Sequence, residues 1–322
     1  MPFNSASNCT ELARQLEMYY LPTMYTLEFC LGFVGNLVVI LGYIFCLKEW
    51  KSFNVYLFNL SVSDLIFLCT LPRLVHNYAQ GNWKENSSYY CISNRYILHV
   101  NLYSSILFMV WVSVDRYLLL KNPMRLHILQ RLRSAIVVAI FTWVIVNVQI
   151  APLMFFIIKD LKRNHWSTCH DFGSLSGIHG MLSYSLALTL TGYLLPLLGL
   201  CLSSYKITVF LKAQERVFDN QAASYRRPLR LVAALAAMFF MLYSPYHVMR
   251  NVRLASLLNQ FGLPQCTKDY IEGIYIITRP IAFSHSVMNP IFYFFMGDHF
   301  RELLLDKLKK LMAGKSSHHQ GN

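Results

Sequence analysis

The sequence predicts an all-α integral membrane protein: a seven-transmembrane-helix bundle followed by a short amphipathic cytoplasmic helix. Of its 322 residues, 55% are apolar and only 14% are charged, against about a quarter in soluble domains. The stretches 134–158, 181–205 and 231–249 contain no Asp, Glu, Lys or Arg. Because about 20 such residues in an α-helix cross a bilayer, these stretches are long enough to span a membrane.

Seven apolar segments follow one another along the chain. We expect a helix in each: 21–47, 53–79, 88–120, 133–158, 180–212, 226–258 and 269–297. They define a transmembrane domain over 21–297, with an extracellular N-terminal segment over 1–20 and a cytoplasmic tail over 298–322. The tail begins with a predicted interfacial helix, helix 8, over about 298–312. Its apolar side consists of Phe300, Leu303, Leu304, Leu308 and Leu311.

The loops differ in their content of Lys and Arg. Those after the first, third, fifth and seventh segments hold seventeen such residues, and the other side holds six. Basic loops stay cytoplasmic, so we expect a multi-pass plasma-membrane protein with its N-terminus outside. The first twenty residues lack the pattern of a removable signal peptide. Topology and anionic lipids of the inner leaflet account for the basic excess, and nothing indicates binding to nucleic acid.

Glycosylation sequons and cysteines agree with this orientation. Asn8 and Asn86 begin sequons in segments assigned to the outside, whereas the sequon at Asn59 lies within a span, where no glycan could be added. Four of the eight cysteines fall within apolar runs and are expected to be packing residues. The other four predict two extracellular disulfides, with three pairings open: Cys9, Cys91, Cys169 and Cys266.

Charged residues inside spans are costly, so they indicate function. Asp64 in the second span would be paired with a cation, a sodium ion or a polar cluster; the alternative is a protonated packing residue. Asp115-Arg116-Tyr117 ends the third span at its cytoplasmic end. Adjacent opposite charges there are usually a solvated boundary, but we interpret this triplet as a cytoplasmic lock. Prolines within spans predict kinks: Pro152, Pro196, Pro245 and Pro290.

Distinctive motifs lie in every predicted span. They are Gly35-Asn36 in the first, Asn59-Leu60-Ser61-Val62-Ser63-Asp64 in the second, Cys91 and Asp115-Arg116-Tyr117 in the third, Trp143 in the fourth, Pro196 in the fifth, Phe239 with Pro245 in the sixth and Asn289-Pro290-Ile291-Phe292-Tyr293 in the seventh. As a set they resemble the rhodopsin-like (class A) G-protein-coupled receptors over nearly the whole chain.

The resemblance implies a receptor that is not an enzyme and needs no cofactor. Its partners would be a ligand, membrane lipids and a heterotrimeric G protein of the Gi or Gq type. By the resemblance, Cys91 bonds Cys169 and Cys9 bonds Cys266. The chain departs from the family at Tyr243, where a Trp is usual, and at Ser204, where a Tyr is usual. The residues implied in switching and G-protein coupling are Asp64, Asp115, Arg116, Tyr117, Asn289, Pro290 and Tyr293.

Other membrane-protein classes fit less well. An opsin needs a lysine in its seventh helix, and 269–297 has none. A serine protease would place a Gly-x-Ser-x-Gly-type motif on a strand and helix, but the nearest match, 173–177, falls in a loop. A transporter would show internal repeats. His247, His285 and His299 lack metal-ligand spacing, and we expect them to be hydrogen-bonded core or boundary residues.

Basic side chains gather in the outer halves of the third, sixth and seventh spans. Arg95 and His99 are four residues apart and share a helical face, which Tyr103 continues. Arg250 and Arg279 lie in the outer halves of the sixth and seventh spans, and no carboxylate inside these three spans matches them. These groups predict a ligand with more than one negative charge. Arg73 and Arg253 are instead expected to extend to the membrane rim.

A finer resemblance, carried by stretches such as 91–96, 245–253 and 278–280, is to the members of this family that bind succinate. It implies that this dicarboxylate is the ligand, and the alternatives are 2-oxoglutarate and extracellular nucleotides. The residues implied in binding, with Tyr103 from the face described above, are Arg95, His99, Arg250, Arg279, Tyr25, Tyr78 and Asp171.

Overall fold

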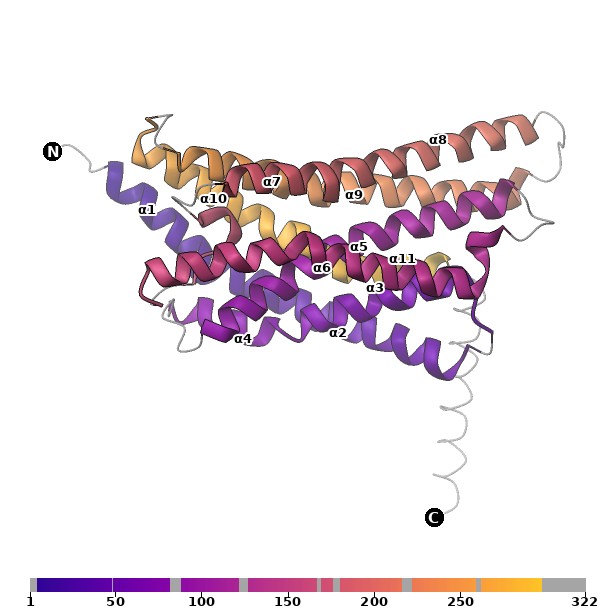
Figure 1. The fold of residues 1–322 in the computed structure, drawn as a ribbon, viewed down its shortest axis with the longest axis horizontal. Coiled ribbons are helices and arrows are strands. Elements are labelled where there is room, and N and C mark those ends of the chain that lie inside the picture. The colour runs from indigo at the N-terminus through magenta and orange to yellow at the C-terminus, as the bar shows by residue number, and fades with distance from the viewer. Residues whose placement is uncertain are drawn as a thin grey trace, which may run out of the picture.

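The computed structural model describes residues 5–47, 49–81, 88–121, 127–166, 169–175, 180–215, 222–258 and 262–296. Within these ranges all regular elements are helical, and the long ones lie side by side along one direction (Figure 1). In order they are α1 (Ser5–Gln15), the π-turn Leu16–Tyr20, α2 (Leu21–Phe45), α3 (Ser52–Leu68), α4 (Leu71–Ala79), α5 (Ser88–Lys121), the 3₁₀ turn Ile128–Gln130, α6 (Leu132–Arg163), the 3₁₀ turn Phe172–Ser174, α7 (Met181–Thr189), the π-turn Leu190–Leu194, α8 (Leu195–Glu215), α9 (Ala222–Ser256), α10 (Gln265–Phe283) and α11 (His285–Met296).

These elements form seven consecutive rods, which confirms the predicted bundle. The rods are α1–α2, α3–α4, α5, α6, α7–α8, α9 and α10–α11. Six of them, in the part of the chain that the structure describes, are long and apolar enough to cross a membrane. The seventh is divided at Ser284, and its outer half carries Lys268, Asp269, Glu272 and Arg279. The predicted helix 8 lies outside the described residues.

The first rod begins earlier than its apolar segment. Helix starts at Ser5 rather than near residue 21 and continues through a π-turn into α2. Thr10 donates to Asp269 of α10 at 3.1 Å, and Tyr20 donates to the Ile277 carbonyl at 3.1 Å. Because this N-terminal stretch is polar on average, its composition did not predict a helix. The helix is amphipathic and packs one face on the bundle.

Helix irregularities occur near four prolines. Two π-helical turns end at Tyr20 and Leu194, two residues before Pro22 and Pro196. The second rod breaks at Cys69 and Thr70, just before Pro72, and the seventh breaks at Ser284, four residues after Pro280. Only Pro196 among these was singled out from the sequence. The helices containing the other three run through them without interruption: Pro152, Pro245 and Pro290.

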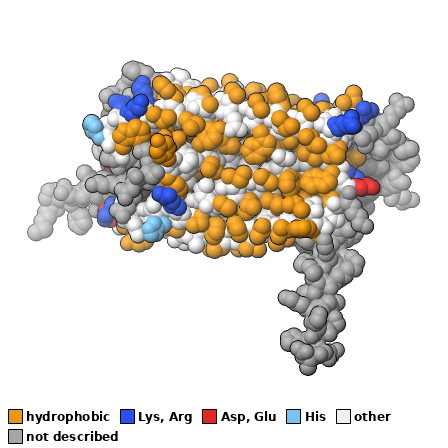
Figure 2. Space-filling model, turned by 60° about the horizontal axis from the view of Figure 1, so that its bottom comes forward, with side chains coloured by type: hydrophobic (Ala, Val, Ile, Leu, Met, Phe, Trp, Pro, Cys, Tyr) orange, Lys and Arg blue, Asp and Glu red, His pale blue; other side chains and the backbone are white. Residues whose placement is uncertain are grey.

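The outer surface of the bundle is apolar along its middle. Leu31, Val34, Val137 and Val148 are each more than 60% exposed. Figure 2 shows hydrophobic side chains covering the length of the rods, with Lys and Arg gathered at the two ends. A soluble protein rarely exposes so large an apolar patch, so the surface is that of a multi-pass membrane protein.

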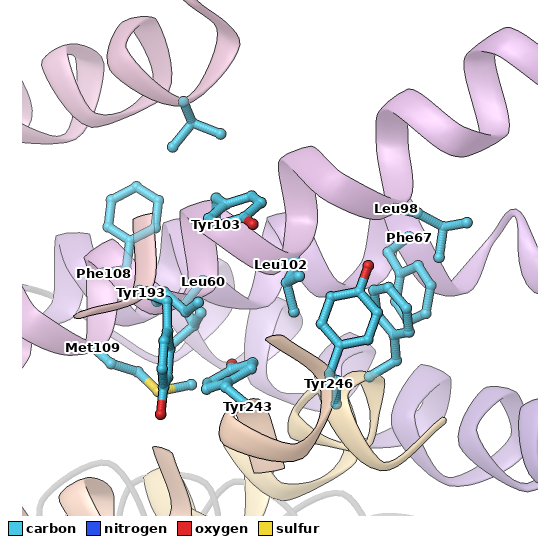
Figure 3. Packing of buried hydrophobic residues seen from close by; sticks show 14 of the residues in the cluster. Leu60, Phe67, Leu98, Leu102, Tyr103, Phe108, Met109, Tyr193, Tyr243 and Tyr246 are labelled. Carbon is cyan, nitrogen blue, oxygen red and sulfur yellow. The ribbon is translucent and has the colours of Figure 1, made fainter. Parts of the chain in front are cut away.

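Polar contacts and aromatic rings fix the rods to one another inside. Trp143 of α6 donates to the Asn59 side chain at 2.9 Å, which agrees with the expectation that this asparagine carries no glycan. Asn36 of α2 donates to the Ser286 carbonyl at 2.8 Å. Figure 3 shows Tyr193 and Tyr243 among the buried side chains between the helices.

A disulfide joins the outer end of α5 to the loop before α7. It links Cys91 to Cys169, as expected from the resemblance. Cys266 is also disulfide-bonded, but the Cys9 side chain lies outside the described part, so that pairing stays a prediction. The sequons at Asn8 and Asn86 are likewise untested, because the Asn8 side chain and Asn86 lie outside it too. Four cysteines of the apolar runs are free: Cys30, Cys46, Cys69 and Cys201.

Candidate ligand site

Two buried arginines meet one loop carboxylate in the outer half of the bundle. Arg95 of α5 and Arg279 of α10 place guanidinium nitrogens 3.2 Å and 3.4 Å from the same atom, Asp171 Oδ1. Both arginine side chains are 3% exposed, and the aspartate is 12% exposed. The sequence places cations here but does not show that Asp171 already bridges two of them.

Asp171 is held in place by its neighbours in the loop and in α10. Tyr275 donates a hydrogen bond to Asp171 and accepts one from the Gly173 backbone N–H at 3.2 Å. A Cβ atom at Gly173 would lie 2.6 Å from the Tyr275 ring, so only glycine permits this approach. Burial favours protonation of Asp171, but Arg279 and Arg95 hold its pKa well below the usual range, so it is ionised at physiological pH.

Tyrosines from the first and second rods complete this group. Arg279 Nη2 donates to the Tyr78 hydroxyl at 2.6 Å. The Tyr25 ring lies 6.3 Å from that of Tyr78, and its buried hydroxyl makes no hydrogen bond within the described structure. Tyr78 therefore contacts Arg279 directly, and Tyr25 lies next to Tyr78.

Arg95 keeps unused hydrogen-bonding capacity. Its Nη1 atom is near Asp171, but the geometry is that of an ion pair and not of a hydrogen bond. Nε and Nη1 are both buried without a hydrogen-bond acceptor among the described residues. Buried donors normally have partners, so these two atoms could bind an added anion.

Arg250 forms a second cationic centre, separate from the first. Its guanidinium donates to Tyr103 Oη at 2.8 Å, Ser185 Oγ at 3.1 Å and Thr189 Oγ1 at 2.9 Å. The side chain is fully buried, and no carboxylate pairs with it among the described residues. The three predicted arginines thus form two centres: Arg95 with Arg279, and Arg250 alone.

His99 and Phe172 lie between the two centres. His99 Nδ1 is 2.7 Å from the Arg95 carbonyl, so it carries the proton, and Nε2 accepts from Tyr246 Oη at 3.2 Å. The Phe172 ring centroid lies 5.1 Å from that of His99 and 4.6 Å from the Arg250 guanidinium carbon. This loop residue fills the space that separates the cations.

A pocket of about 250 Å³ adjoins the first centre. Two carboxylates line it that were not predicted, Glu17 of the first rod and Glu272 of α10. Glu272 also pairs with Arg253 at 2.6 Å, and Arg253 is only 6% exposed. The expectation that Arg253 extends to the membrane rim is wrong, because its ion pair with Glu272 of α10 holds it inside the bundle. The full lining is Glu17, Cys169, His170, Asp171, Ser174, Glu272 and Arg279.

The sequence held signals for some of the residues that were missed. Tyr275 precedes Arg279 by four residues, and Ser185 precedes Thr189 by four, so each pair shares a helical face. Both pairs point inward. Phe172 carried no such signal, because a residue in an irregular loop has no periodicity.

The triplet Asp115-Arg116-Tyr117 contains an ion pair between adjacent residues. Arg116 Nη2 lies 3.2 Å from Asp115 Oδ2, and its guanidinium carbon is 3.6 Å from the Phe53 ring centroid. Ser52 of α3 donates to Asp115. Tyr117 lies 5.7 Å from the Lys206 ammonium. The Tyr293 side chain lies outside the described residues.

Asp64 is surrounded by a polar cluster, one of the three partners considered for it. It accepts from Asn101 at 2.9 Å, Ser105 at 3.2 Å and Asn289 at 2.7 Å. No group of three or more His, Cys, Asp and Glu gathers as a metal site in the described ranges.

The expectation of a hydrogen-bonded His247 is wrong. Neither of its ring nitrogens has a hydrogen-bond partner in the described structure, because aromatic residues surround the ring, which stacks 4.5 Å from that of Tyr193.

Comparisons with known proteins agree with the geometry. Residues 35–293 match the model of the 7 transmembrane receptor (rhodopsin family). The chain is 47% identical to succinate receptor 1 of Rattus norvegicus over 97% of its own length and 98% of the relative's, and 46% identical to that of Mus musculus over 94% of each. It is 32% identical to P2Y purinoceptor 1 of Homo sapiens, covering 95% of this chain and 82% of the relative. The chain therefore belongs to the rhodopsin family of seven-transmembrane receptors, which couple to G proteins and are not enzymes.

Proposed function

We propose that the chain is a plasma-membrane receptor, with its N-terminus outside, that binds succinate in the outer half of the bundle and activates a heterotrimeric G protein of the Gi or Gq type. The main support for this proposal is the pair Arg95 and Arg279, which contact the same Asp171 oxygen. Two donor atoms of Arg95 have no hydrogen-bond acceptor among the described residues. One ligand carboxylate would bind these donors. The relatives named succinate receptor 1 support this reading.

The second carboxylate requires a second cation, which is Arg250. Among the described residues its charge is met by neutral hydroxyl and carbonyl groups and by the aromatic rings of Phe172 and Tyr246. Neutral acceptors satisfy the guanidinium N–H groups but leave the charge uncompensated, and a buried charge without a counterion is costly. Phe172 fills the space between the two centres, so this ring has to move for an anion to reach Arg250 from the first centre. Such an anion would relieve that cost.

The size of the pocket favours a small ligand. Its volume of about 250 Å³ is below the roughly 300–1,000 Å³ of pockets for drug-sized molecules. Micromolar binding of a molecule as small as succinate needs about −1 kcal/mol per non-hydrogen atom, near the upper limit for small ligands. Only several charge-assisted hydrogen bonds can supply this, and the two arginine centres offer them.

Two alternatives share this anionic chemistry. The likeness to P2Y purinoceptor 1 favours an extracellular nucleotide, which would need room for a base and ribose beside its phosphates. A 2-oxoglutarate molecule would use the same two cations as succinate. Both alternatives are outcomes of the test that follows.

The test is a ligand panel on cells that express the chain, with G-protein activation recorded and untransfected cells as the control. We expect succinate to be active and butyrate, which has the same carbon chain and one carboxylate, to be inactive. Equal potency of butyrate and succinate would contradict the dicarboxylate proposal. Activation by nucleotides or by 2-oxoglutarate alone would support the respective alternative.

A further inference from the structure

A histidine lies beside the buried carboxylate of Asp64. His285, the first residue of α11, and Asp64 of α3 are both 0% exposed. His285 Nε2 is 3.5 Å from Asp64 Oδ1, and no other hydrogen-bond partner of Nε2 exists in the described structure. This contact joins the second and seventh rods in the middle of the bundle.

The hydrogen bond at the other ring nitrogen decides where the histidine proton is. His285 Nδ1 lies 2.7 Å from the Ala282 carbonyl oxygen. A carbonyl oxygen only accepts, so Nδ1 carries a hydrogen. In neutral histidine Nε2 would then hold only a lone pair, and it would face a carboxylate oxygen that also holds lone pairs. That arrangement is repulsive unless a proton or another cation is shared.

The other partners of Asp64 do not remove this conflict. Asn101, Ser105 and Asn289 donate to it through neutral N–H and O–H groups. They stabilise the carboxylate but do not neutralise its charge, and a buried unpaired charge is costly. No Lys or Arg pairs with Asp64 in the described ranges.

We propose that Asp64 and His285 form a buried proton-binding site in which the carboxylate and the imidazole share one proton. This proton replaces the lone-pair contact by a charge-assisted hydrogen bond, whose usual N···O length is about 2.7–2.9 Å. It also makes the pair neutral overall. The site takes up a proton in place of the sodium ion considered for Asp64.

The surroundings of the pair favour a proton over a metal ion. The ring of His285 occupies one side of the carboxylate, the two asparagines direct N–H groups at it, and Ser105 places a single hydroxyl oxygen beside it. Sodium, a hard cation, requires oxygen ligands. The other titratable group facing the pair is Tyr243 of α9, whose ring centroid lies 5.3 Å from that of His285; α5 contributes only neutral side chains in the described part.

The residues around the shared proton belong to four helices: Asp64 to α3, Asn101 to α5, Tyr243 to α9 and His285 to α11. A rearrangement that separates the imidazole from the carboxylate breaks the hydrogen bond that the shared proton makes. The proton therefore favours the arrangement of helices in which the two side chains are together.

Sodium binding tests the proposal, because a sodium ion cannot bind Asp64 while the site holds the shared proton. The purified receptor is unfolded thermally in NaCl and in an equal concentration of N-methyl-D-glucamine chloride, without ligand. We expect the wild-type Tm to be the same in both salts. In His285→Asn the side chain cannot carry the proton, so Asp64 takes up sodium and the Tm rises by several degrees in NaCl.

Two further variants make the result specific. Adding Asp64→Asn to His285→Asn should abolish the sodium response. His247→Asn is the matched control, since this histidine is equally buried but contacts no carboxylate, and it should show no response. A rise of the wild-type Tm in sodium, or folded His285→Asn without a rise, would overturn the proposal. If His285→Asn does not fold, the wild-type comparison decides alone.

Discussion

Three arginines that look alike in the sequence differ in what surrounds them. Arg95 and Arg279 are paired with Asp171, whereas Arg250 is held by hydroxyl groups of α5 and the fifth rod. Under the proposed function, a ligand carboxylate at the first centre would share the cations with Asp171 and join an existing ion pair. At the second centre it would supply the missing counterion. The effect of substitution should therefore differ between the centres.

Arg279→Lys tests the first centre. Arg279 contacts both Asp171 and the Tyr78 hydroxyl through its Nη2 atom, and a lysine ammonium group lacks the planar fork that binds both oxygens of a carboxylate. We expect succinate potency to fall at least about tenfold, or about 1.4 kcal/mol. Dose–response curves at matched surface expression measure it. Arg73→Lys is the control, because Arg73 is exposed and stacks on Tyr90; an equal loss in both variants would contradict a specific role for Arg279.

Arg250→Ala should lower potency by at least as much as Arg279→Lys. It removes the charge and leaves the buried Tyr103 hydroxyl without its donor, whereas Ser185 and Thr189 keep their hydrogen bonds to Asn251. An unsatisfied buried polar group costs about 1–3 kcal/mol. The same dose–response assay applies, with surface staining to separate potency from folding. Unchanged potency would place the second carboxylate elsewhere.

At the scale of elements, the sequence predicts the rods better than it predicts their irregular turns. Long uncharged runs specify helices, because the bilayer leaves the backbone no other partner. The π-turn at Leu190–Leu194 and the bridging of two arginines by Asp171 depend on contacts between segments far apart in the chain. Periodicity carries no information on such contacts. The early start of α1 was missed for another reason, namely that amphipathic helices have low mean hydropathy.

Gly192→Ala tests the role of the π-turn in the fifth rod. A Cβ atom at Gly192 would lie 2.5 Å from the Tyr103 ring, which holds Arg250. The ring must move, so we expect lower succinate potency and a loss of stability of about 1–3 kcal/mol, as for overpacked cores. Gly199→Ala on the same rod is the control, since its Cβ would meet only Val110 at 3.6 Å. Similar behaviour of both variants in binding and thermal unfolding would show that the close approach has no consequence.

At the scale of the molecule, the proposed ligand site and the Asp115-Arg116-Tyr117 triplet lie toward opposite ends of the bundle. The cationic centres lie in the outer halves of α5, α9 and α10, and Asp115-Arg116 ends the same α5 helix on the other side. A ligand shifts the receptor only if it binds one arrangement of the helices better than another. Binding and output should therefore be separable by mutation.

Arg116→Ala tests that separation. Arg116 pairs with Asp115 and stacks on Phe53, and it contacts no residue of the two cationic centres within the described structure. We expect ligand affinity to be spared while nucleotide exchange on the G protein is abolished, because the side chain that would contact the G protein is gone. Radioligand binding and GTP-analogue uptake on the same membranes measure the two quantities. Lys121→Ala, an exposed position at the end of the same helix, is the control. Undiminished exchange in Arg116→Ala would mean that output does not pass through this residue, and loss of binding would mean that the two ends of α5 are coupled more tightly than the contacts indicate.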